Sequence, residues 1–84
     1  MKLVLIEWID SHHGRGWRSL DQIEAECQPL FIRSVGWLVS EKNGQKIIVG
    51  NLYSEKNEDV QIQAGRDICI PNKAIIKTTV LRGK

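Results

Sequence analysis

Short hydrophobic runs alternate with polar turns along the chain, and their spacing predicts several strands and one helix. The first run, residues 2–9, is rich in aliphatic and aromatic side chains that fall on the two faces of a strand. Residues 20–27 instead carry apolar side chains at the three- and four-residue intervals of a helix. Ser19 and Gln22 match a capping box at the start of this helix, and Pro29 prevents its continuation.

The rest of the pattern predicts a hairpin and two further strands. Residues 31–40 and 46–53 are the two arms of the hairpin, because the Asn43-Gly44 pair between them is a strong signal for a two-residue turn. Residues 60–64 alternate apolar and polar side chains, and residues 74–81 form the closing strand. The linking segments are predicted as a charged connector at 54–59, a turn or bulge at 65–67 and an Ile70-Pro71 step.

Five or so strands and one short helix predict a single, mainly β domain that occupies residues 1–84. Two architectures fit this order of elements. One is a small, strongly bent antiparallel sheet, and the other is an SH3-like barrel with the short helix after the first strand. A single core of this size supplies limited stability, so self-association is one way for the chain to gain more.

Composition and charge narrow the class of protein. Twelve basic and ten acidic residues give a net charge of +2, which is too low for a protein that grips long nucleic acid through a broad basic face. No run of apolar residues is long enough to cross a membrane. Cys27 and Cys69 form no C-x-x-C motif, and no signal peptide is recognisable. We therefore expect a cytoplasmic protein with reduced thiols, a single long-range disulfide being the alternative.

The chemistry of the chain is concentrated in residues 8–18, which hold two of the three tryptophans and both histidines. Glycines on either side of Arg15 free the backbone to expose N–H groups to an anion, while the guanidinium can clamp a phosphate. Trp17 either folds back as a lid on the core or stacks on a base or a partner. The candidate ligand-binding residues are His12, His13, Gly14, Arg15, Gly16, Trp17 and Arg18.

Metal binding and catalysis are less well supported by the same run. His12 and His13 stand near Asp10, but adjacent histidines in an extended loop diverge, and no zinc-binding spacing is complete. Ser11 beside His12 is only a sequence neighbour, which does not establish a nucleophile and its base. We therefore expect no metal, no cofactor and no enzymatic activity.

The chain also resembles a known group of proteins in the order of its short motifs. These motifs are Val4-x-x-x-Trp8-x-Asp10, Gly16-Trp17, Ser34-Val35-Gly36-Trp37-Leu38-Val39 and Ile70-Pro71. In this order they resemble a widespread family of small bacteriophage proteins. Phage proteins of this size that are not virion parts often antagonise host defence, and one class consists of cyclic-nucleotide sponges. The resemblance implies a symmetric homo-oligomer that sequesters a nucleotide signal without cleaving it.

Under this hypothesis the loop residues receive separate roles. Trp17 would stack on a base, Arg15 and Arg18 would contact phosphates, and His12 or His13 would bond the base or ribose. An alternative hypothesis is an SH3-like protein-interaction module that inhibits a host protein through an exposed aromatic and basic loop. A weak nuclease or hydrolase is the third, and chemical change in a candidate substrate would separate it from the other two.

Overall fold

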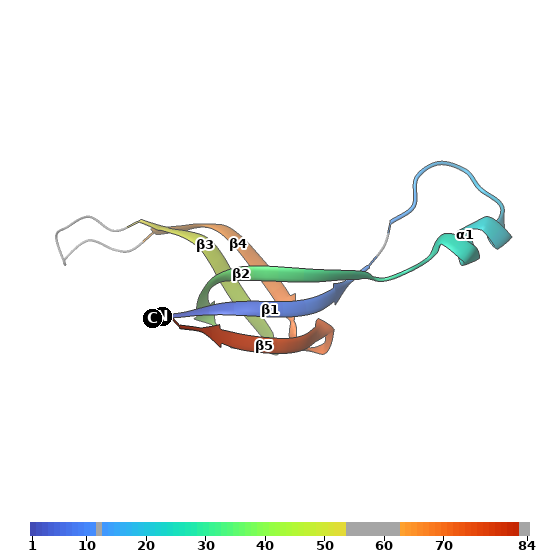
Figure 1. Ribbon diagram of the computed structural model, residues 1–84. Coiled ribbons are helices and arrows are strands. Elements are labelled where there is room, and N and C mark those ends of the chain that lie inside the picture. Colours follow the sequence, from blue (N-terminus) through green and yellow to red (C-terminus); the bar gives the residue numbers. More distant parts are fainter. Residues whose placement is uncertain (12, 54–62, 83–84) are drawn as a thin grey trace.

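The computed structural model describes residues 1–11, 13–53 and 63–82. Its elements in chain order are β1 (Lys2–Asp10), α1 (Leu20–Glu26), β2 (Leu30–Ser40), β3 (Gln45–Tyr53), β4 (Gln63–Pro71), a 3-10 turn η1 (Asn72–Ala74) and β5 (Ile75–Leu81). Figure 1 shows these strands as one body, from which α1 projects at the end of a long connection. The predicted connector at 54–59 and the start of the predicted strand at 60–62 lie outside the described residues.

The five strands form one antiparallel sheet in the order β4-β3-β2-β1-β5. A mainly β fold with one short helix after the first strand is thus confirmed. Within the described residues the outer strands β4 and β5 do not pair, so the sheet is open and not closed into a barrel. Instead the sheet bends, and β3 and β4 cross the direction of β1, β2 and β5 at a steep angle (Figure 1).

The bend encloses a small aliphatic core. Val4 and Ile6 of β1, Ile48 of β3 and Ile70 of β4 are fully buried together. The partly buried side chains packed against them are those of Trp8, Leu38, Ala74 and Ile75. Val4, Ile6 and Trp8 alternate along β1 with side chains of the opposite face, as the strand period of two requires.

Two turn predictions had different outcomes. Asn43 and Gly44 have φ angles of 61° and 73°, and these positive values confirm the predicted two-residue hairpin turn between β2 and β3. The turn or bulge predicted at 65–67 is wrong, because β4 runs through these residues in unchanged register with β3. The irregularity there is confined to Arg66, whose φ is 54°, beside Gly50 of β3.

The predicted helix cap is present. The Ser19 hydroxyl accepts a hydrogen bond from the Gln22 backbone N–H at 3.2 Å, and the Gln22 side chain accepts one from the Ser19 N–H at 3.1 Å. This reciprocal pair satisfies backbone donors that the first turn of a helix leaves free. None of the seven helical residues is buried, however, and α1 stands off the sheet. No helix in the described part of the chain is long and apolar enough to span a membrane.

Candidate functional site

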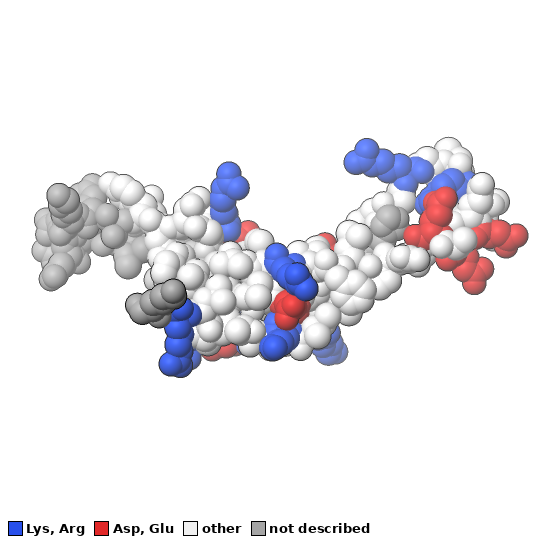
Figure 2. Space-filling model, in the orientation of Figure 1, with Lys and Arg blue, Asp and Glu red and all other residues white. Residues whose placement is uncertain are grey.

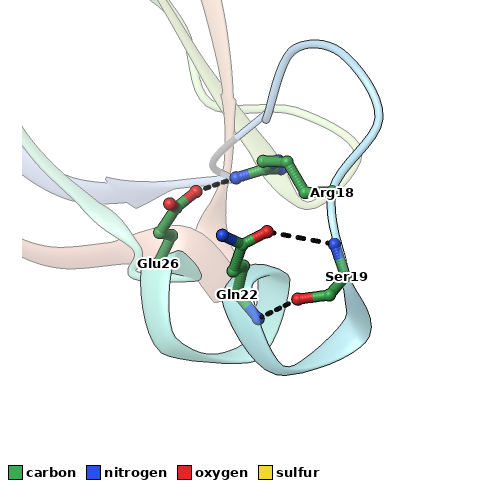
Figure 3. A network of polar contacts seen from close by, with 4 residues as sticks. All are labelled: Arg18, Ser19, Gln22 and Glu26. Atoms are coloured by element: carbon green, nitrogen blue, oxygen red, sulfur yellow. Dashed lines mark hydrogen bonds and ion pairs between the residues drawn. The ribbon is translucent and has the colours of Figure 1, made fainter.

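Six of the seven candidate ligand-binding residues, 13–18, lie on the connection between β1 and β2, of which we call residues 13–29 the arm. Its first part is a loop that leads to the capping box of α1. Figure 3 shows that the arm is tied together by its own polar contacts: the two cap bonds of Ser19 and Gln22, and an ion pair between Arg18 and Glu26. The loop therefore leads directly into an ordered, capped helix.

Arg18 also closes the loop on the side of Gly14. A Cβ built on Gly14 would overlap Nη2 of Arg18, so the guanidinium occupies the place of that missing side chain. With Glu26 on its other side, only 23% of the Arg18 side chain is exposed. The phosphate-binding role predicted for Arg18 therefore competes with an internal ion pair, and this arginine shapes the loop.

Trp17 and Arg15 project from the loop into solvent. Trp17 is fully exposed, with a relative accessibility of 103%, so the alternative in which it folds back as a lid on the core is wrong. Arg15 is also exposed and makes no ion pair with any other described residue. Gly16 lies between them with a φ of 75°, a conformation that glycine adopts without strain. The structure thus displays an indole and a guanidinium from neighbouring positions.

The described side chains beside the histidines make only two polar contacts. His12 lies outside the described residues. Nε2 of the exposed His13 is 3.3 Å from the Ser11 hydroxyl, while the Asp10 carboxylate accepts a hydrogen bond from the Ser11 backbone N–H at 2.8 Å. Asp10 is thus engaged with the backbone, and among the described residues it makes no hydrogen bond to the His13 imidazole. Among the described residues, no group of three His, Cys, Asp or Glu side chains is placed to hold a metal ion.

A second feature, which sequence reasoning missed, is a groove at the end of the sheet from which the arm departs. It has a volume of about 570 Å³, within the range of ligand pockets. The groove is lined by Glu7 and Trp8 of β1, Phe31, Ile32 and Arg33 of β2, and Ile76 and Lys77 of β5. Because Phe31 and Ile76 are 74% and 57% exposed, the groove presents apolar surface to solvent.

Charged side chains cross one side of this groove in a row. Strand register places Glu7 opposite Arg33 on one neighbouring strand and opposite Lys77 on the other. Nε of Arg33 and Oε1 of Glu7 are 3.2 Å apart, whereas Lys77 is exposed and forms no ion pair within the described chain. Two cations around one carboxylate leave this side of the groove with a net positive charge.

The sequence held only an indirect signal for the groove. Its residues come from three strands, and they meet only through the register of β1 with β2 and β5. The alternation of apolar and polar residues in the first two strands places Glu7 and Arg33 on one face, but it does not fix which residues face each other. No protein-family model, curated protein or solved structure matches the chain.

Proposed function

We propose that this protein binds a nucleotide second messenger of the cyclic-oligonucleotide type and sequesters it without cleaving it. If the chain is phage-encoded, as its resemblance to small phage proteins implies, this activity would take place in the cytoplasm of an infected bacterium. Removal of a defence signal there benefits the phage. Sequestration requires tight binding and no turnover, so the site needs neither a nucleophile nor a general base.

The observation that carries the proposal is the exposure of Trp17 next to Arg15 on a loop that leads into the capped helix α1. A planar indole stacks on any nucleobase, and such a contact contributes about 1–3 kcal/mol per base. A guanidinium forms paired, charge-assisted hydrogen bonds to phosphate oxygens. The two side chains therefore suit the two parts of a nucleotide.

The remaining loop residues complete the proposed site. The backbone around Gly16 offers N–H groups to a phosphate, since its positive φ turns the chain as in an anion-binding nest. His13 is exposed and available to bond a base or ribose. Arg18 acts as a positioning residue, because its guanidinium holds Gly14 and Glu26 together.

Thermal unfolding with defined ligands tests the binding. We expect one of cyclic di-AMP, cyclic di-GMP or cyclic GMP–AMP to raise the unfolding midpoint by roughly 10 °C at a hundredfold excess over Kd, with no shift from AMP. After heat denaturation, mass spectrometry should recover that ligand intact. The absence of a shift with every cyclic dinucleotide, or a chemically altered ligand, would contradict the proposal.

Substitution of the two displayed side chains tests the site. Trp17→Ala should weaken ligand affinity about 5- to 150-fold through the lost stacking contact. Arg15→Ala should weaken it about 10- to 100-fold through the lost charge-assisted bonds. Lys42→Ala is the matched control, because Lys42 is an exposed cation beside the β2–β3 turn. Isothermal titration measures the affinity of each variant. If all three variants bound the ligand as tightly as the wild-type chain, this loop would be excluded as the site.

A second function is favoured by the exposed apolar side chains of the arm. Leu20 and Ile23 of α1 are 82% and 39% exposed close to Trp17, a combination typical of protein-binding surfaces. In this alternative the protein inhibits a host protein through the arm. A defined host enzyme should then co-purify with the wild-type chain and be lost with Trp17→Ala, while no cyclic dinucleotide shifts the unfolding midpoint.

A further inference from the structure

We propose that α1 of one copy docks into the groove of a second copy, so that two chains exchange their arms. The assembly does not depend on the proposed nucleotide binding. It follows from two unpartnered surfaces of the same chain: the apolar side of α1 (Leu20, Ile23 and Cys27) and the groove at the end of the sheet.

The helix requires a partner to be stable. Isolated helices shorter than about 12–15 residues are marginal in water, and α1 has seven residues, none of them buried. Leu20 and Ile23 lie three positions apart and so share one side of the helix, with Cys27 directly beyond it. The capping box orders the first turn, but no described residue of the same chain covers the apolar side.

The groove has the size and character to receive this side of the helix. Four of its lining residues are apolar, namely Trp8, Phe31, Ile32 and Ile76, of which Phe31 and Ile76 have exposed side chains, and its volume is about 570 Å³. An amphipathic helix that lays apolar side chains into a hydrophobic groove is a recurring mode of protein recognition. Burial of Leu20 and Ile23 would cover the exposed ring of Phe31 at the same time.

Charge complementarity identifies a second copy as the occupant. Helix α1 carries three carboxylates and no basic residue, and only Glu26 has an ion-pair partner, Arg18, in the described structure. Outside the arm, the described residues include eight Lys or Arg and four Asp or Glu. Figure 2 shows carboxylates gathered over α1 and basic side chains spread over the sheet. Asp21 and Glu24 would therefore meet the net positive side of the groove, close to Lys77.

The short connection behind α1 directs the helix away from its own groove. Three residues, Cys27 to Pro29, separate Glu26 from the first residue of β2. Cys27 is extended, with φ −74° and ψ 103°, and the proline restricts the residue before it to extended conformations. Such a segment spans about 10 Å without reversing direction, and in Figure 1 it carries α1 outward from the sheet.

When two copies exchange their arms, the same interface between α1 and the groove forms twice, as expected for a symmetric dimer. Trp17 precedes Leu20 by three residues, so docking also brings the loop that carries Arg15 and Trp17 next to the sheet of the second copy. The indole then gains a second wall, which a single chain does not provide at this position.

Charge reversal tests this arrangement. We expect the wild-type chain to sediment as a dimer at micromolar concentration. Glu24→Lys or Lys77→Glu alone should weaken the dimer at least about tenfold, because like charges then face each other in both interfaces. An equimolar mixture of the two variants should restore the dimer, since in the mixed pair each arm again meets a groove of opposite charge.

Lys42→Glu is the matched control, an equal change of charge near the β2–β3 turn that should leave the dimer intact. Circular dichroism checks that every variant keeps its sheet. A monomeric wild-type chain, or single variants that fail to recover on mixing, would overturn the proposal. The double variant Glu24→Lys/Lys77→Glu carries both changes in one chain. If it stayed monomeric and regained the stability lost in each single variant, α1 would dock within its own chain, and this result would overturn the proposal as well. Nucleotide binding is measured separately, so failure of the dimer and failure of the proposed function are distinguishable.

Discussion

Trp8 and Trp17 belong to one short stretch of sequence but have different surroundings. Trp17 is fully exposed, whereas Trp8 packs against the core and its Nε1 donates a hydrogen bond to the Ser34 hydroxyl at 3.0 Å. A partly buried indole N–H without an acceptor loses its hydrogen bond to water without compensation. The Ser34 hydroxyl is thus what allows β1 to place a tryptophan beside the aliphatic core.

Removal of this hydroxyl should destabilise the fold. Ser34→Ala leaves the Trp8 N–H without its acceptor, and we expect a loss of about 1–2 kcal/mol in the free energy of unfolding. Urea denaturation measures this change, and Ser40→Ala is a control that removes a long 3.4 Å bond to an exposed backbone N–H. If the two variants proved equally stable, the Trp8–Ser34 bond would have no role in the core.

Gly36 lies where the backbone of β3 leaves no room for a side chain on β2. A Cβ at this position would lie 2.8 Å from the Val49 carbonyl oxygen, a backbone atom that cannot move aside cheaply. Gly36→Ala should therefore separate the strands and cost about 1–3 kcal/mol, the usual penalty for overpacking. Gly65→Ala is the control, because a Cβ there meets no atom within 4 Å. A Gly36→Ala variant with unchanged thermal unfolding would contradict this reading of the close approach.

At the scale of elements, α1 is locally organised but independent of the core. Ser19→Ala removes one half of the capping box and should cost the helix about 1 kcal/mol. Because α1 buries no residue in its own chain, we expect the monomer to lose helical circular dichroism signal while the unfolding midpoint of the sheet stays unchanged. Gln22→Ala, which removes the reciprocal bond, should act in the same direction. A fall in the midpoint of the monomeric sheet would show that α1 does pack on it.

Most elements could be predicted from sequence because their signals are local. The capping box and the Asn43-Gly44 turn each depend on residues within one turn of chain, and both are present. The turn or bulge expected at 65–67 is absent because β3 pairs with β4 through that segment, and tertiary pairing outweighs the local preference of a glycine.

The local sequence signals did not predict where the arm lies relative to the sheet. Leu20 and Ile23 give the same periodicity whether they cover the sheet of their own chain or that of another. The loop around Arg15 and Trp17 was predictable from its composition, but the exposure of Trp17 was one of two alternatives. The groove could not be located from the sequence, since Trp8 and Phe31 line the same groove only after strand register is set.

For the whole molecule, the dimensions are large relative to the core. The chain measures 59 × 27 × 26 Å with a radius of gyration of 17.3 Å, whereas a compact domain of this length has about 12 Å. Only five hydrophobic residues are buried among the described ones: Val4, Ile6, Ile48, Val49 and Ile70. A core of this size leaves a single chain marginally stable. In the proposed dimer, surface covered by the second copy would add to that stability in proportion to the apolar area removed from water.

If the chain dimerises through its arms as proposed, its thermal stability depends on protein concentration. When folding and association are coupled, mass action favours the folded dimer as the concentration rises. We expect the unfolding midpoint of the wild-type chain to increase by about 5 °C for each tenfold rise in concentration, given the unfolding enthalpy of a domain of this size. The midpoint of Glu24→Lys should vary much less, because that variant is largely monomeric over the same range. Differential scanning calorimetry from about 10 to 1,000 μM measures both slopes. A wild-type midpoint that is constant across this range would mean that the small core is sufficient by itself, and that the apolar side of α1 is reserved for a different partner.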